Sequence, residues 1–292
     1  MGTGHHKKGS SFAPRNEDHD ADHTAVWVVS FLDLMGYRRD LEALGDRPSA
    51  DEDDIHRRFA NVVERHRILI EGLKMYSERL GQISSDPNQR LVSHYRQDVD
   101  IRVTGFSDSV FIESAFGHLP DSPLIALNSV IDTSIAAFFV NLRVESPLRG
   151  GLDIGYGLWS KGHLYTAATV RAVELEKCAK YPRILVGNNL IRTIESLASS
   201  GGEAGHMAQI IQDVFYEDPE DHRMGLDFMG VASQRSYARG FTADDVRKIW
   251  LFARESQGEF GARGMSKERG YYDRLVRYME PRLQQWGISE GQ

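Results

Sequence analysis

Hydrophobic and polar positions first predict a buried strand followed by a helix. The run AVWVVSFLDLMGY, which begins at Ala25, is apolar, β-branched and aromatic, and it predicts a strand that ends near Asp33 with a turn at Gly36. Behind an acidic segment at Ser49–Asp54, apolar residues recur at helical spacing through about residue 80.

A hairpin and a second helix are predicted next. The segment VDIRVTGFSDSVFIES, residues 99–114, consists of two alternating runs joined at Gly105–Asp108, a pattern typical of a β-hairpin. Pro123 then begins the helix, since proline suits the first helical turn. The apolar stripe of this helix consists of Leu127, Ile131, Phe138 and Leu142.

The second half of the chain predicts further alternating elements. They are, in order, a glycine-interrupted strand at 148–159, a helix at 167–180, a strand at 181–186, a helix from about 188 to 198, a glycine-rich break at 201–205, a hairpin at 214–229, and helices from about Thr242 and Lys267. The whole order begins β-α-β-β-α-β-α-β. It predicts an α+β fold with a ferredoxin-like or palm-type core, a sheet with helices on one face.

Composition divides the chain into three parts. Residues 1–24 have almost no aliphatic side chains, which predicts a disordered arm. This segment contains four of the eleven histidines, and a metal-binding role for them is the less favoured alternative. Residues 25–235 are expected to form the main folded domain. Residues 236–292 are expected to form a helical extension packed on the core.

Charge and cysteine content exclude several classes of protein. The 292 residues are 41% hydrophobic and 26% charged, as in an ordinary globular protein. A net charge of −7 argues against a nucleic-acid binder with a broad basic face. The apolar runs are short for a membrane span, and Cys178 is the only cysteine, which rules out an intrachain disulfide. No secretory signal is visible, so a cytoplasmic protein without nucleic-acid or membrane partners is expected.

Two aspartates occupy special backbone positions. Asp33 closes the first strand, and Asp108 lies in the hairpin turn. Each alone is also typical of a turn or cap. In a core of this order the first strand commonly lies centrally, so the two carboxylates are expected to converge. Paired carboxylates without His or Cys suit Mg²⁺ or Mn²⁺, and the free N–H groups of the turn Leu34–Tyr37 suit phosphate oxygens.

These segments resemble a known enzyme family. FLDLMGY (residues 31–37) and FSDSVF (106–111) are similar to the metal-binding strand and hairpin of class III nucleotide cyclases, and RGGLDIGYG (149–157) resembles a later strand. More narrowly, FSDS, RGG and AVELEKCAKYPRILV (172–186) resemble the bacterial pyrimidine cyclases of the Pycsar antiphage system. The resemblance covers about residues 25–230 and implies that residues 25–235 are a nucleotide cyclase catalytic domain. It also implies two divalent metal ions and a homodimer with active sites at its interface.

The resemblance also implies site residues. The metal positions are Asp33, Leu34 and Asp108. The nucleotide-binding positions are Phe31, Met35, Gly36, Tyr37, Arg38, Thr104 and His163.

Departures from the family are as informative as the matches. Thr104 stands where purine cyclases have a lysine that reads adenine, and His163 stands where they have an aspartate. Val170 and Glu174 replace the asparagine and the transition-state arginine. This favours a smaller base and leaves the catalytic cation open. Arg171 is the first candidate, Arg149 and Arg38 are others, and Arg183 is expected to be a structural ion-pair partner at a strand end.

The resemblance therefore implies a uridylate cyclase that converts UTP to 3′,5′-cyclic UMP and pyrophosphate. In that family uridylate cyclases outnumber cytidylate cyclases, and the product acts as an antiphage second messenger on a separate effector protein. The alternatives are a cytidylate cyclase and a non-catalytic nucleotide-binding dimer of the same fold. A diguanylate cyclase is disfavoured because the sequence has no GGDEF-like loop.

Overall fold

The structure is a computed structural model that describes two parts of the chain before residue 100 only in short stretches and most of the chain after it. The described residues are 22–35, 60, 63–64, 67–68, 70–71, 101–106, 108–116, 122–236 and 241–289.

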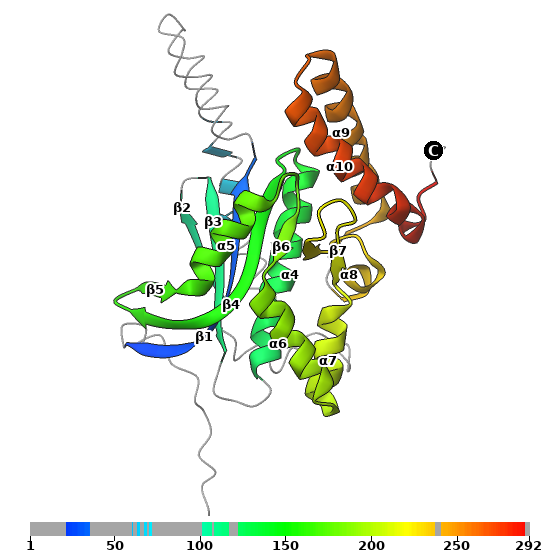
Figure 1. Ribbon diagram of the computed structural model, residues 1–292. Coiled ribbons are helices and arrows are strands. Elements are labelled where there is room, and N and C mark those ends of the chain that lie inside the picture. Colours follow the sequence, from blue (N-terminus) through cyan, green and yellow to red (C-terminus); the bar gives the residue numbers. More distant parts are fainter. Residues whose placement is uncertain are drawn as a thin grey trace, which may run out of the picture.

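A single mixed sheet runs through the described structure (Figure 1). Its strands are β1 (His23–Leu34), β2 (Ile101–Phe106), β3 (Ser109–Phe116), β4 (Leu148–Ser160), β5 (His163–Thr166), β6 (Ile184–Val186), β7 (Phe215–Glu217) and β8 (Met224–Leu226). The strand order is β2-β3-β1-β4-β6-β8-β7, and β5 pairs with β4 outside this path. Strands β4 and β6 are parallel, and the other neighbours are antiparallel.

Helices cover both faces of this sheet (Figure 1). They are α4 (Ser122–Arg143), α5 (Ala167–Cys178), α6 (Asn188–Ser199), α7 (Gly202–Gln212), α8 (Val231–Ser236), α9 (Ala243–Ala262), α10 (Ser266–Leu283) and the short 3₁₀ helix η1 (Gln284–Trp286). The described residues between 60 and 71 are all helical, as the sequence predicts for that region.

The first four strands confirm the predicted ferredoxin-like core. Strand β1 lies between β3 and β4 and is antiparallel to both, with β2 outside β3. The continuous apolar run of β1 explains its central position, because Val28 and Leu32 face one side of the sheet while Trp27 and Phe31 face the other, and all four are buried.

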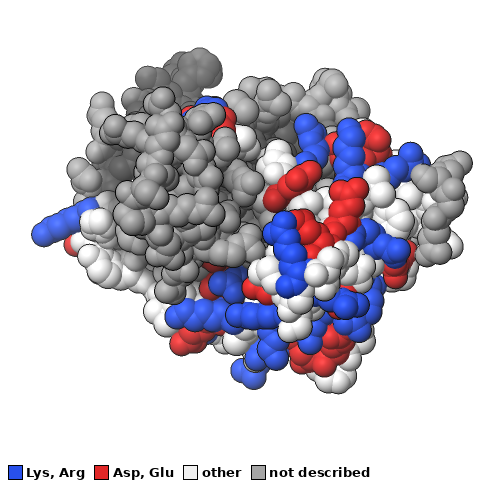
Figure 2. Space-filling model, turned by 90° about the horizontal axis from the view of Figure 1, so that it is seen from above, with Lys and Arg blue, Asp and Glu red and all other residues white. Residues whose placement is uncertain are grey.

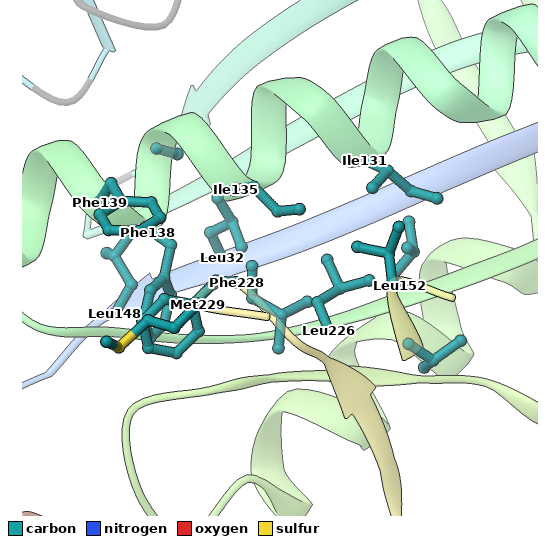
Figure 3. Close-up of a cluster of buried hydrophobic side chains, with 14 of the residues drawn as sticks. Leu32, Ile131, Ile135, Phe138, Phe139, Leu148, Leu152, Leu226, Phe228 and Met229 are labelled. Atoms are coloured by element: carbon teal, nitrogen blue, oxygen red, sulfur yellow. The ribbon is translucent and has the colours of Figure 1, made fainter. Parts of the chain in front are cut away.

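The larger core lies between the sheet and α4. Leu32 of β1 and Leu152 of β4 pack there with the α4 stripe that includes Ile131, Ile135 and Phe138 (Figure 3). Residues of the C-terminal helices belong to the same cluster of buried side chains, so α9 and α10 share the main core; they include Val246, Ile249, Ala253, Leu275 and Met279.

The opposite face is covered by α5, which corrects the expectation of helices on one face. Ala168 and Ala172 of α5 pack on Trp27, Val29 and Phe31 of β1. Glycine makes this approach possible, since a Cβ at residue 151 would lie 2.1 Å from the carbonyl oxygen of Ala172.

Most of the predicted elements are present. The hairpins β2–β3 and β7–β8, helix α4 and the helices after Thr242 and near Lys267 are confirmed. Strand β5 and helix α7 have no counterpart in the sequence prediction. The break predicted at 201–205 in fact starts α7, because Gly201 has a positive φ of 73° before the helix and Gly205 lies against the end of α6.

The expectations of a disordered N-terminal arm and of no membrane span can be compared with the described residues. Strand β1 begins at His23, inside the arm predicted for residues 1–24, and residues 1–21 lie outside the described part. Of the described helices, α4 alone has the length and apolar composition of a membrane span, and 89% of that stretch is buried within the molecule. Acidic and basic side chains interleave on the face seen in Figure 2.

Candidate functional site

Asp33 lies at the end of β1, directly opposite the first residue of β3. The register pairs Asp33 with Ser109, and the Ser109 hydroxyl donates a hydrogen bond of 3.0 Å to Oδ1 of Asp33. This contact orients the carboxylate at the edge of the α5-covered face, where it is mostly but not completely buried.

Asp108 is held beside Asp33 by the main chain. The amide of Leu34 donates to the carbonyl of Asp108 at 3.0 Å, and the amide of Met35 donates to the carbonyl of Pro147 at 2.9 Å. The end of β1 is thereby joined to the hairpin turn on one side and to the start of β4 on the other. The structure thus brings together two aspartates that are 75 residues apart in the sequence (108 − 33).

An arginine and a glutamate complete the cluster. Arg149, the partner of Asp33 on β4, places its Nη2 atom 3.3 Å from Oδ2 of Asp33. Its Nε atom forms an ion pair with Oε1 of Glu176, a residue of α5. The Glu176 side chain is only 5% exposed, whereas a third of the Arg149 side chain is exposed.

Burial and mutual repulsion govern the acidity of this cluster. Burial raises the pKa of Asp33, an effect opposed by the Ser109 hydrogen bond. The charge of Asp108 adds to the rise in the pKa of Asp33, and Arg149 counteracts it. Burial likewise raises the pKa of Glu176, with Arg149 opposing and the two aspartates contributing. The four side chains therefore form one electrostatic unit.

The donor set fits a hard divalent cation that also binds its substrate. Among the residues that the structure describes, no group of three or more His, Cys, Asp or Glu side chains is arranged to hold a metal by itself. Two aspartates next to a strand end match the Mg²⁺ pattern of one or two carboxylates completed by substrate phosphates. The side chain of Leu34 is apolar and its amide is already bonded to Asp108, so its carbonyl oxygen is the atom left to serve as a ligand.

The nucleotide-binding residues expected near the end of β1 have different surroundings. Phe31 is buried against Phe111, with ring centroids 4.7 Å apart, and belongs to the cluster under α5. Met35 is half-buried at the strand end. Gly36, Tyr37 and Arg38 lie outside the described residues.

The two residues expected to read the base lie far apart along the sheet. Thr104 is exposed on β2 and belongs to the same face as Asp33; its partner on β3 is Phe111, which pairs with Phe31 of β1. His163 is exposed on β5 opposite Ser160, eleven residues beyond Arg149 on β4 (160 − 149). At about 3.3 Å per strand residue, this is roughly 35 Å along the chain. Within one chain, His163 is therefore not part of the cluster around Asp33.

The arginines have distinct partners. Arg171 forms an ion pair with the buried Asp153 and donates to the carbonyl of Ile154 at 2.6 Å. Arg183 is confirmed as a structural ion-pair partner, since it is buried between Asp218 and Asp221. Among Arg149, Arg171 and Arg183, Arg149 is thus the one that contacts the aspartate pair of its own chain.

Sequence reasoning missed two members of the cluster. Ser109 directly follows Asp108, and only the strand register reveals that its hydroxyl faces Asp33. Glu176 lies in the ELE sequence of α5, and helical periodicity could have placed it on the buried side of that helix with Ala168 and Ala172. Its pairing with Arg149 depends on tertiary structure.

Comparisons with known proteins give a distant likeness. No protein-family model and no curated protein matches this chain. Among solved structures, the adenylyl cyclase CyaB from P. aeruginosa has a TM-score of 0.39 and 12% identity, over 70% of this chain and 93% of that one. The guanylyl cyclase domain of the RhoGC fusion protein from the fungus Blastocladiella emersonii has a TM-score of 0.37 and 12% identity, over 70% and 95%.

A third solved structure is described as a class III adenylyl cyclase-like ATP-binding protein from Pseudomonas aeruginosa. Its TM-score is 0.36 and its identity 16%, over 57% of this chain and 34% of that one. At such low scores the likeness says nothing about substrate or activity, which must be argued from the residues of the site. The chain is distantly similar in structure to class III adenylyl and guanylyl cyclase domains.

Proposed function

We propose that this protein is a nucleotide cyclase that forms a 3′,5′-cyclic nucleotide and pyrophosphate from a nucleoside triphosphate. The observation that carries the proposal is the convergence of Asp33 and Asp108, which the Leu34 amide and the Ser109 hydroxyl hold in place. In this reaction the ribose 3′-oxygen loses its proton and forms a bond to the α-phosphorus, while the bond to the pyrophosphate oxygen breaks.

The chain's own residues provide binding and orientation. Asp33, Asp108 and the carbonyl of Leu34 would hold divalent ions, which supply charge neutralisation and a lower pKa for the 3′-hydroxyl. Ser109 fixes the orientation of the Asp33 carboxylate. Arg149 offers a partly exposed guanidinium beside the same site, where negative charge on the phosphates has to be stabilised.

A homodimer is part of the proposal. The distance between the Asp33 cluster and His163 supports active sites built from two chains, with metal residues from one protomer and base-reading residues from the other. The β4–β5 hairpin exposes apolar side chains on one face, including Tyr156 at 84% and Tyr165 at 62%, with Leu158 between them. Val170 is exposed on α5, which covers the opposite face of the sheet. Exposed apolar groups of this kind mark interaction surfaces.

The first test compares activity with matched variants. Purified protein is incubated with ATP, GTP, CTP or UTP and Mn²⁺, and the products are resolved by chromatography and mass spectrometry. We expect a cyclic mononucleotide from the wild type and from Asp213→Asn, which changes an exposed carboxylate on α7's C-cap. We expect less than about a tenth of that turnover from Asp33→Asn and Asp108→Asn.

Three other outcomes would contradict the proposal. Full turnover in either aspartate variant removes that residue from the metal site. Binding of a nucleotide without any product supports the non-catalytic dimer instead. A linear or dinucleotide product indicates a different transferase.

Pyrimidine specificity is the finer part of the proposal, with UTP as substrate and CTP as the alternative. Thr104 offers a short hydroxyl and His163 a group that is not a fixed anion, so a purine would leave polar edges poorly paired. Two such losses of about 1–3 kcal/mol discriminate by roughly 10²–10⁴. Comparable kcat/KM values for ATP and UTP would contradict the assignments of both residues. A cyclic pyrimidine product would act as a second messenger on a separate effector in antiphage defence.

A further inference from the structure

Arg149 is shared between two carboxylates at the proposed metal site. Its Nη2 atom contacts Asp33 at 3.3 Å, while its Nε atom is paired with Glu176. The guanidinium therefore occupies one oxygen of a carboxylate that a divalent cation would use. Arg149 and the cation compete for Asp33.

The charges of the cluster show how this competition is balanced. Asp33, Asp108 and Glu176 bring three negative charges and Arg149 brings one positive charge, so the cluster carries two negative charges when all are ionised. One divalent cation would neutralise these two negative charges. If Glu176 neutralises Arg149, the two aspartates remain for the metal. Without Glu176, Arg149 neutralises Asp33 and one negative charge remains.

The position of Glu176 suits this role. It projects from the buried side of α5 and is almost fully enclosed, and its pairing with Arg149 occurs where solvent screening is weak. The glycine at position 151 lets α5 lie directly on β4, two residues beyond Arg149. Helix α5 thus brings a carboxylate to the arginine beside Asp33.

We propose that Glu176 is a positioning residue that holds Arg149 as its counter-ion and so keeps the Asp33–Asp108 pair available to a divalent cation. The inference rests on the proposed function, because it concerns the same metal site. It predicts that cation affinity depends on the charge balance of the pair Arg149 and Glu176 rather than on either residue alone.

The experiment measures Mn²⁺ binding directly, without nucleotide or turnover. The full-length protein is titrated with Mn²⁺, and the free ion is quantified by electron paramagnetic resonance. The variants are Glu176→Gln, Arg149→Gln, the double variant with both changes, and Asp33→Asn. Glu195→Gln is the matched control, because it removes one charge from an exposed position on α6. A thermal melt of each variant checks that it is folded.

We expect Glu176→Gln to bind Mn²⁺ roughly tenfold more weakly than the wild type, since Arg149 then neutralises Asp33. Arg149→Gln should bind at least as tightly as the wild type, and the double variant should return to within about threefold of it. If Glu176 acted only by anchoring α5 through the ion pair, the double variant would bind as weakly as Glu176→Gln, because it lacks that ion pair as well.

Two results would overturn the inference, and a third would overturn the site itself. Wild-type affinity in Glu176→Gln refutes it, and so does a double variant that binds as weakly as Glu176→Gln. If Glu176→Gln does not fold, Arg149→Gln and the double variant still test the inference, because Mn²⁺ binding roughly tenfold weaker than the wild type in either of them would refute it. Unchanged Mn²⁺ binding in Asp33→Asn would instead refute the proposed metal site.

Discussion

Replacing Gly151 by alanine tests the close contact that places α5 over the site. A Cβ at this position would lie 2.1 Å from the Ala172 carbonyl oxygen and 2.6 Å from Cβ of Leu175, whereas ordinary contact begins at 3.4 Å. Neither neighbour is the far end of a flexible side chain. Helix α5 must therefore retreat by about 1 Å from β4, which opens the small core around Trp27 and Phe31.

The expected loss of stability follows from these contacts. Overpacking of a well-packed interior costs about 1–3 kcal/mol. Because the added Cβ would make two contacts this short, we expect the cost of Gly151→Ala to lie at the upper end of that range. Alanine also lowers the conformational entropy of the unfolded chain, which stabilises the folded state by about 0.4–1 kcal/mol. The net loss should be about 2 kcal/mol, or roughly 4 °C or more in Tm for a chain of this size.

The assay is a urea titration followed by far-ultraviolet circular dichroism, supported by a thermal melt. Gly258→Ala in α9 is the matched control, because its added Cβ would meet nothing within 4 Å beyond its chain neighbours and the backbone of its own helix. Alanine is the better helix former, so this variant should be about 0.5–1 kcal/mol more stable than the wild type. Equal stability of Gly151→Ala and the wild type would refute the reasoning, as would a loss of the same size in both variants.

Three other perturbations test the buried charges and the helix caps. Arg183→Met should lower the free energy of unfolding by about 3–5 kcal/mol, because it leaves Asp218 buried without its cation; the exposed Arg263→Met should change it by less than about 1 kcal/mol in the same urea titration. Burial raises the pKa of Glu113 to about 7, so the folded state binds more protons than the unfolded state between about pH 4.5 and 7, and stability falls as pH rises through this window. Glu113→Gln should therefore be more stable than the wild type at pH 8 by up to about 3 kcal/mol, with the difference vanishing near pH 4; an equal gain at both pH values would contradict the burial argument. Thr242→Ala removes the capping box at the start of α9 and should cost about 1 kcal/mol in urea, whereas Thr242→Ser should restore most of it.

Local patterns in the sequence determined much of the core. The uninterrupted apolar run of β1 indicated a central strand, and the alternation around Asp108 indicated the hairpin that pairs with it. These two signals also located both aspartates, since one closes a strand and the other lies in a turn. The sequence analysis missed helix α7 because its glycines are typical of a loop, whereas in the fold Gly201 and Gly202 adopt positive φ values where the helix begins.

The composition of the site was decided by tertiary structure. Strand register places the Ser109 hydroxyl on Asp33, and the pairing of β1 with β4 brings Arg149 to the same carboxylate. Glu176 joins them only because α5 packs on the face of the sheet that the sequence analysis left uncovered. Periodicity reports which side of an element is buried, but not which sheet face a helix covers. That choice depends on contacts between residues distant in sequence, here the fit of α5 against a glycine in β4.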